Sequence, residues 1–134
     1  MVKDTVYLPR YGWKVEFFLD FDCDHIGEVM RALQDVDCEF ETLERAYMSM
    51  RRCNEDTGLT YSTKDYRTSV AVAYTASSAS EMLNTVAHEC AHICAHITQS
   101  FIIKLTEEEF CEMVGDLVGG LSDSILKVLE YYKR

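Results

Sequence analysis

Three histidines lie in one short run of the chain, TVAHECAHICAH at residues 85 to 96, each four positions after the previous one. On a helix, side chains four residues apart project from the same face one turn apart, so two imidazoles can converge on one metal ion. His88 and His92 have this spacing, and Glu89 directly follows the first of them. Neutral imidazole is a good zinc ligand, and a glutamate at this position can take a proton from zinc-bound water. The run predicts a zinc ion held by His88 and His92, with Glu89 as catalytic acid/base.

The third histidine, His96, lies two turns from His88, about 12 Å along a helix axis, which is too far for one ion. It could pair with His92 in an alternative two-histidine site, but that pair lacks an adjacent glutamate. We expect His96 to lie beside the metal site or to be exposed. The competing interpretation is a solvated polar face that happens to carry histidine. An apolar stripe is predicted on the opposite side of this helix, formed by Met82, Val86, Cys90, Ile93, Ile97 and Phe101.

A catalytic zinc needs a third protein ligand and one open position. The acidic segment TEEEFCEMVGDLVGG, residues 106 to 120, has helical spacing and follows at a suitable distance. Glu109 borders the apolar stripe of this segment and is the acid best placed to point inward. Glu109 could instead complete a capping box with Thr106. Other acids of the segment remain alternative ligands, namely Glu108, Glu112 and Asp116.

The rest of the chain must position these residues. Residues 13–21 alternate in polarity, which predicts a strand with Trp13, Val15, Phe17, Leu19 and Phe21 on one face. Spacing and capping residues predict further elements, in order helices at 24–36 and 40–53, strands at 59–63 and 68–75, and helices at 78–101, 106–118 and 121–132. This order makes an α+β fold in a single domain, 1–134, with a small mixed or antiparallel sheet packed against the histidine-bearing helix.

Composition limits the possible partners. The net charge of −10 argues against nucleic acid and against an anionic membrane surface. No apolar run approaches the roughly 20 residues of a membrane helix, and residues 1–13 lack the apolar stretch of a secretory signal. The six cysteines are widely spread, without a Cys-x-x-Cys pair, and we expect reduced and mostly buried thiols. A cytoplasmic location is therefore expected.

The motif NTVAHECAHICAHI followed by EEEFCEMVGDL resembles the small gluzincin-type zinc peptidases. It is similar to short phage- and prophage-borne proteins of this type and, more distantly, to peptidases that cleave phage repressors. The resemblance covers about residues 78 to 120. It implies a zincin-type active-site helix, with His88 and His92 as zinc ligands, Glu89 as catalytic acid/base and Glu109 as third ligand.

The predicted function is therefore zinc-dependent hydrolysis of a peptide bond in a peptide or protein substrate. Tyr61, Tyr66 and Tyr74 are candidate donors to the oxyanion, although each also suits a purely structural role in or beside a strand. Two alternatives remain open. One is a non-catalytic, phage-type assembly or interaction protein with a structural or vestigial metal site, and the other is a regulatory protein that hydrolyses a single partner. The short chain favours a narrow substrate range, and the sequence does not specify an oligomeric state.

Overall fold

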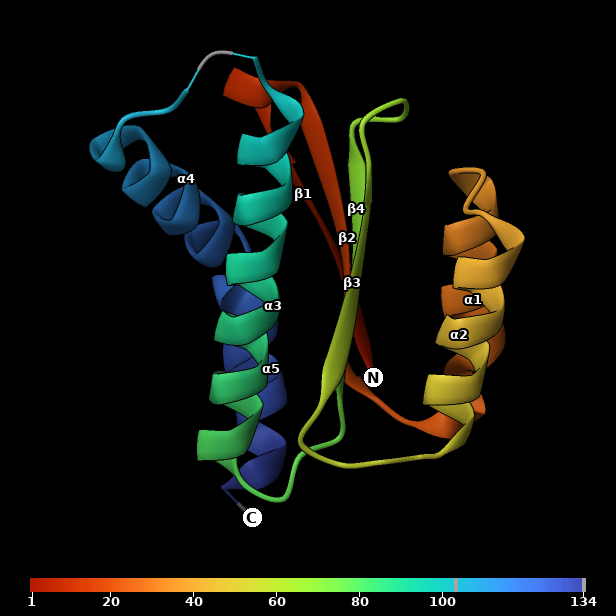
Figure 1. Cartoon of the computed structure of the whole chain (residues 1–134). Helices are drawn as coiled ribbons and strands as arrows, with labels where there is room; N and C mark the ends of the chain where they lie inside the picture. Colours follow the sequence, from red (N-terminus) through yellow and green to blue (C-terminus); the bar gives the residue numbers. More distant parts are fainter. Residues whose placement is uncertain (103, 134) are drawn as a thin grey trace.

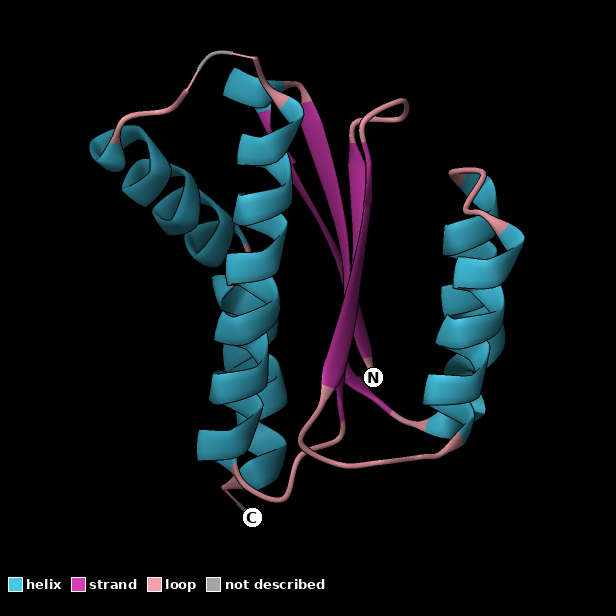
Figure 2. Cartoon of the chain, viewed as in Figure 1, coloured by secondary structure: helices cyan, strands magenta, loops and turns pink. Residues whose placement is uncertain are grey.

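Four strands form one mixed sheet in the order β1-β2-β4-β3, and helices cover both of its faces (Figures 1 and 2). The computed structural model describes residues 1–102 and 104–133. Strand β1 runs antiparallel to β2, β2 runs parallel to β4, and β4 runs antiparallel to β3. The strands are β1 (Val2–Leu8), β2 (Trp13–Phe21), β3 (Gly58–Thr63) and β4 (Thr68–Tyr74). The α+β prediction is confirmed.

The helices lie in two layers that bury two separate cores. In Figure 1, α1 (Ile26–Asp35) and α2 (Phe40–Arg51) cover the right-hand face of the sheet. The left-hand face is covered by α3 (Ala79–Ser100), α4 (Glu107–Gly120) and α5 (Ser122–Tyr132). Two short 3₁₀ helices, η1 (Pro9–Tyr11) and η2 (Cys23–His25), follow β1 and β2. Across the described residues, no helix is long and apolar enough to span a membrane.

Strand β1 was not predicted from the sequence. Its first residues alternate between partly buried and exposed positions, and only Val6 and Leu8 are buried. Since β1 pairs with β2 on one side only, it is an edge strand, and its polar residues can stay in contact with water. The weak apolar alternation of such an edge strand explains why the pattern did not predict it.

A backbone irregularity in β2 corrects one sequence-based expectation. Phe21 was expected on the same face as Trp13, but it packs in the α1/α2 core, whereas Trp13 belongs to the core under α3–α5. The strand register shifts between Leu19 and Phe21, and Asp20 between them has a φ of 59°. The extra residue turns the end of the strand over, as in a β-bulge.

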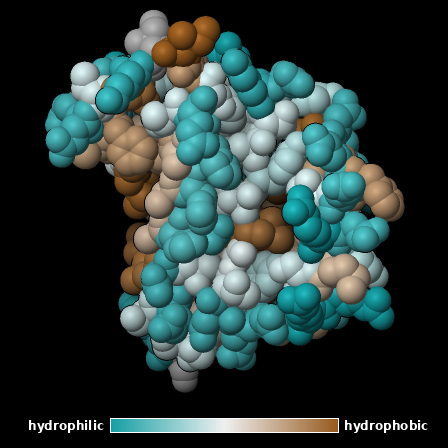
Figure 3. All heavy atoms as spheres, viewed as in Figure 1, coloured by the Kyte–Doolittle hydropathy of each residue, from teal (hydrophilic) through white to brown (hydrophobic). Residues whose placement is uncertain are grey.

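The sheet face that meets α3 carries small side chains. On β4, Ala71 and Ala73 pack against the α3 side, while the larger Val70 and Val72 pack against α1 and α2. Because small side chains occupy little depth, α3 can lie close to this part of the sheet. In Figure 3, the surface between α3 and the α1/α2 layer is mostly pale, of near-neutral hydropathy, around one brown, hydrophobic patch; β3 occupies this region in the same view of Figure 1.

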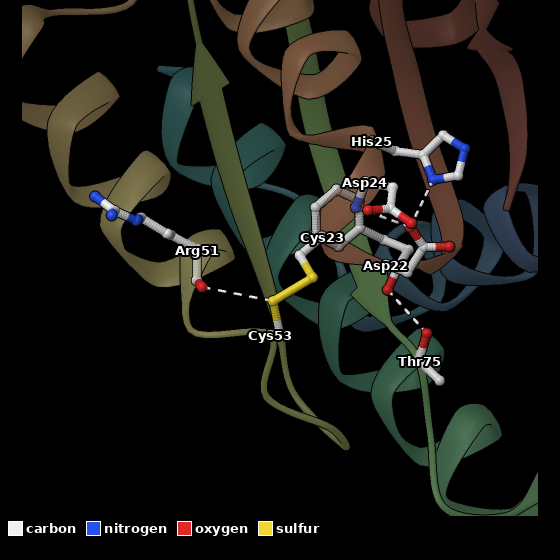
Figure 4. Close-up of a disulfide and its surroundings, with 8 residues drawn as sticks. Asp22, Cys23, Asp24, His25, Arg51, Cys53 and Thr75 are labelled. Carbon is white, nitrogen blue, oxygen red and sulfur yellow. Dashed lines mark hydrogen bonds and ion pairs between the residues drawn. A yellow bond between two sulfur atoms is a disulfide. The ribbon is translucent and has the colours of Figure 1, made fainter.

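Two of the six cysteines are bonded to each other, so the expectation of reduced thiols was wrong for this pair. Cys23 follows β2 and Cys53 follows α2, and their disulfide ties these two chain segments together (Figure 4). The two cysteines are 30 positions apart in the sequence, so the disulfide closes a loop that contains α1 and α2. Because disulfides persist mainly in oxidising environments, the cysteines no longer support a cytoplasmic location.

The expectation of burial holds for most of the other thiols. Cys38, Cys90 and Cys94 are buried, whereas Cys111 on α4 is exposed. Burial raises the pKa of Cys90 to about 12 and that of Cys94 to about 11. These two thiols therefore stay protonated and unreactive at neutral pH.

We expect the folded, non-reduced protein to react with iodoacetamide at Cys111 and to be protected at Cys38, Cys90 and Cys94. Peptide mapping without reductant should recover Cys23 linked to Cys53. Replacing both Cys23 and Cys53 by Ser should lower the free energy of unfolding by about 3–4 kcal/mol, the chain-entropy contribution of a loop of this length. Iodoacetamide labelling of Cys23 and Cys53 in the native, air-oxidised protein would contradict the pairing.

Candidate metal centre

The histidine run lies in α3, the longest helix among the described residues. Its N-cap is Ser78, whose side chain accepts a hydrogen bond of 3.1 Å from the Glu81 backbone amide. One face of α3 is buried in the core, including Met82, Val86 and Ile93 as the apolar stripe predicted. A helix anchored along this face holds the side chains of its other face in fixed positions.

His88 and His92 project together from the exposed side of α3, and their rings meet. The two Nε2 atoms are 3.1 Å apart, and the ring centroids are 4.7 Å apart. Two nitrogens bound at about 2.0–2.1 Å to one tetrahedral zinc ion lie about 3.3–3.4 Å from each other. The pair therefore fits a metal ion with only a small adjustment. Two neutral rings at this distance can also share one hydrogen bond, so the pair alone does not identify a metal.

Glu89 points away from solvent, toward β3. Its side chain is only 4% exposed, and Oε1 accepts a hydrogen bond of 2.9 Å from the Thr60 hydroxyl. A Cβ added to Gly58 would lie 3.1 Å from both Cγ and Cδ of Glu89 and 2.4 Å from the Val72 carbonyl oxygen. Glycine at position 58 thus leaves the space that the Glu89 carboxylate needs to reach the strand.

A small polar cavity lies where the start of β3 meets α3. Its volume is about 170 Å³, and both His88 and Glu89 line it, together with Asp56, Thr57, Gly58, Asn84 and Thr85. The carboxylate of Asp56 accepts hydrogen bonds from the backbone amide and the hydroxyl of Ser77, both at 2.8 Å. These hydrogen bonds hold Asp56 in the wall of the cavity, which His88 and Glu89 also line.

His96 is held by a chain of hydroxyl groups rather than by the other histidines. Its Nδ1 is 2.8 Å from the Ser62 Oγ, which is 2.7 Å from the Ser69 Oγ. The indole nitrogen of Trp13 donates to Ser69 at 2.9 Å. Burial lowers the pKa of His96, and the neighbouring His92 lowers it further. His96 is therefore partly buried against β3 rather than exposed, and its ring centroid is 6.0 Å from that of His92.

The contacts of Glu109 are with Thr106 and Arg10 rather than with the histidine pair. Glu109 forms the capping box of α4 with Thr106, and its Oε2 accepts a hydrogen bond of 2.8 Å from Arg10. The hydrogen bond from the Thr106 backbone lowers the pKa of Glu109, and Arg10 contributes to the same shift. The capping role that the sequence left open is thus the one observed.

Glu112 and Asp116, two other acids of α4, also lie near Arg10 and Tyr11. Glu112 binds Arg10 at 3.2 Å, and both Glu108 and Asp116 are exposed. The acids Glu109, Glu112 and Asp116 lie near Tyr11, whose pKa is raised mainly by burial and also by their negative charges.

Arg10 and Tyr11 lie in η1, between β1 and β2, whereas His96 and Glu89 contact β3. In the described ranges 1–102 and 104–133, no three His, Cys, Asp or Glu side chains are grouped so that they could hold a metal ion.

None of the three candidate tyrosines lies on the α3 side of the sheet. Tyr61 and Tyr74 pack in or against the α1/α2 core. The hydroxyl of Tyr74 is 2.9 Å from the Ser49 Oγ, and the hydroxyl of Tyr66 donates to Asp37 in the loop after α1. They are therefore excluded as donors to a ligand at the histidine pair.

Sequence analysis did not identify the polar partners that contact α3. Alternate residues of β3, namely Gly58, Thr60 and Ser62, face α3, while Leu59 and Tyr61 between them face the other layer. Ser69 of β4 pairs with Ser62 in the strand register. The sequence does have small polar residues at every second position of β3. That they contact the histidine-bearing helix follows only once the packing of β3 against α3 is known.

Comparison with protein-family models, with curated proteins and with solved structures finds no match to this chain.

The position of Glu109 leads to a testable expectation. Glu109→Gln should change the zinc affinity of the protein less than about twofold, because the carboxylate binds Arg10 and caps α4 instead of pointing to the histidines. The same variant should have a lower Tm, since it loses the ion pair with Arg10. Zinc affinity is measured by competition with a chromophoric chelator. A loss of zinc affinity as large as that of His88→Ala would show that Glu109 is a ligand.

Proposed function

We propose that this protein is a zinc-dependent hydrolase of peptide bonds, with zinc bound by His88 and His92 and with Glu89 as the proton-transferring residue. The observation that carries the proposal is the convergence of the two Nε2 atoms beside a cavity that the Glu89 side chain also lines. The His-Glu-x-x-His spacing on one helix supports it, as does the resemblance to small gluzincin-type peptidases over residues 78 to 120.

In this proposal His88 and His92 bind the metal ion, and Glu89 transfers the proton. The imidazoles would bind the ion through Nε2, and a bound zinc ion would supply Lewis acidity and lower the pKa of its water toward about 7. The Oε1 atom of Glu89 is held in place, because it accepts a hydrogen bond from the Thr60 hydroxyl. The second carboxylate oxygen is the one that can accept a proton and deliver it to a leaving amine, as general acid–base catalysis requires.

The histidine pair supplies two of the three protein ligands that catalytic zinc sites use. Structural zinc sites are closed by four protein ligands, whereas catalytic sites leave a position for water or substrate. Within the described part of the chain only His88 and His92 converge. A zinc ion held by this pair would need one further protein ligand for hydrolysis and would keep one position open for water or substrate. A structural site would need four protein ligands, whereas a vestigial site would need none, so the vestigial site is the alternative to this proposal.

The dimensions of the cavity indicate a narrow substrate range. At about 170 Å³ it is smaller than the roughly 300–1,000 Å³ typical of pockets for drug-sized ligands. It has room for one side chain of a peptide rather than for a long segment. The net charge of −10 disfavours acidic substrates, so we propose neutral or basic peptides or proteins as the substrate class.

Glu89→Gln tests the catalytic role directly. The amide keeps an oxygen that can accept the Thr60 hydrogen bond, so the fold and the zinc content should remain close to those of the wild type. Hydrolysis of a defined library of short peptides, followed by mass spectrometry, should fall by at least about 10²-fold, because an amide cannot accept the proton.

Glu81→Gln is the matched control, since it makes the same change on the same helix two turns earlier, outside the cavity. It should cleave the library at the wild-type rate. Equal cleavage by the wild type and Glu89→Gln would refute the role of Glu89, and absence of cleavage by the zinc-loaded wild type would refute the proposed activity.

A further inference from the structure

A second cavity lies where the turn between β3 and β4 meets the C-terminal end of α3, both at the top of Figure 1. Its volume is about 450 Å³, within the roughly 300–1,000 Å³ typical of pockets for small molecules. Most of its lining is apolar and comes from Trp13, Phe101 and Ile102. Ile102 is 99% exposed, so an apolar molecule bound here would remove its side chain from water.

The charged side chains that line this cavity are both basic. They are Lys64 and Arg67, at the two ends of the turn between β3 and β4, and none of the described acidic residues lines the cavity. Asp65, in the same turn, is exposed and is not part of the lining. The whole chain has 23 acidic and 13 basic residues, so this lining differs in sign from the protein as a whole.

Neither cation is neutralised by an ion pair. Among the described residues, the salt bridges of this protein involve other basic side chains than Lys64 and Arg67. An anionic ligand would therefore not have to displace a carboxylate of the protein. Two cations without a partner beside an apolar surface favour a ligand that carries both a negative charge and an apolar part.

The guanidinium of Arg67 is held in place by the protein. Its Nη1 donates a hydrogen bond of 3.1 Å to the backbone carbonyl oxygen of Tyr11, and its Cζ lies 5.9 Å from the centroid of the Phe101 ring. A cation at this distance over an aromatic ring is attracted to it. The remaining N–H groups of the guanidinium can still bind a ligand, and little side-chain freedom is lost when they do.

The backbone of Arg67 is a second and independent observation. Its φ is 46°, in the left-handed region where glycine is favoured because it has no Cβ. The Arg67 amide donates to the Lys64 carbonyl oxygen at 3.2 Å and closes the turn, and hairpins of this kind commonly have glycine at the left-handed position. An arginine is less favourable there, and residues held in such conformations are concentrated at ligand sites.

The neutral side-chain donors around the cavity are already used within the protein. The indole N–H of Trp13 donates to the Ser69 Oγ at 2.9 Å, and the Ser100 hydroxyl donates to the backbone carbonyl oxygen of His96 at 2.8 Å. A peptide or a sugar bound here would bury polar groups without partners, which lowers affinity. The lining therefore suits a ligand with one anionic group and an otherwise apolar body.

We propose that this cavity binds a carboxylate with an unbranched apolar tail, of the class of medium-chain fatty acids. The carboxylate lies between Lys64 and Arg67, and the tail lies against Trp13, Phe101 and Ile102. The planar guanidinium of Arg67 matches a carboxylate, because two of its N–H groups can donate to the two oxygens. This site is separate from the histidine pair and does not depend on a metal ion.

Binding of octanoate to the zinc-free protein, measured by isothermal titration calorimetry, tests the proposal. Octanol lacks the charge and butyrate lacks most of the tail, so each should bind at least about tenfold more weakly than octanoate. Trp13 is the only tryptophan of the chain. Octanoate brominated at its terminal carbon should therefore quench the tryptophan fluorescence, since bromine quenches by contact and the tail is placed beside this ring.

Two variants test the cations separately. Arg67→Gly removes the guanidinium and places at this φ the residue that suits it best, so the turn should be preserved. It should lower octanoate affinity at least about tenfold, as expected for loss of hydrogen bonds between charged groups. Lys64→Gln should lower it at least about threefold, because the exposed ammonium is a weaker partner. The matched control is Lys127→Gln, which removes an exposed cation of α5 outside the cavity and should leave the affinity unchanged.

Each other outcome overturns a stated part of the proposal. Equal affinity for octanol would remove the role of the cations, and equal affinity for butyrate would remove that of the apolar lining. Binding of the brominated octanoate without quenching of Trp13 would place the ligand elsewhere. Equal affinity for N-acetyl-Leu-Leu would make a peptide carboxyl terminus the ligand instead. Absence of octanoate binding at millimolar concentration, in protein that still binds zinc, would refute this inference and leave the proposed function standing.

Discussion

The close packing of α3 against β3 determines the geometry of the whole candidate site. Helix α3 carries His88, Glu89, His92 and His96, and β3 supplies the groups that orient Glu89 and His96. The contact is possible because Gly58 has no side chain where Glu89 approaches, and because β4 presents alanine and serine rather than larger residues to the same helix. Larger side chains at these positions would move the helix outward and separate Glu89 from Thr60.

This packing also requires that buried polar groups be satisfied. A carboxylate or hydroxyl that is buried between a helix and a sheet without a hydrogen-bond partner lowers the stability of the fold. Thr60 satisfies one oxygen of Glu89, and the pair Ser62 and Ser69 connects Trp13 to His96. The polar residues of β3 therefore do two things with the same atoms. They make the burial of α3 energetically acceptable, and they determine the orientation of the side chains that face the cavity.

The local elements could be predicted from the sequence more readily than the relations between them. Periodicity and capping residues located the five α-helices and three of the four strands, because each of those signals is confined to one segment. Strand β1, the bulge at Asp20 and the Cys23–Cys53 disulfide depend on contacts between distant segments, and they were missed. The pair His88 and His92 could be predicted as neighbours, since one helix fixes their spacing. Glu109 could not be placed, because its position depends on how α4 packs and on Arg10, about a hundred residues earlier in the chain.

The central claim is that His88 and His92 bind one zinc ion through Nε2, with Glu89 beside it and not bonded to it. A crystal structure of the zinc-loaded protein, with anomalous difference maps on both sides of the zinc absorption edge, tests this most directly. The account predicts one strong peak about 2.0–2.1 Å from each of the two Nε2 atoms, with Oε1 of Glu89 still bound to Thr60. A peak between His92 and His96, a peak at Glu109, or no peak near α3 would contradict it.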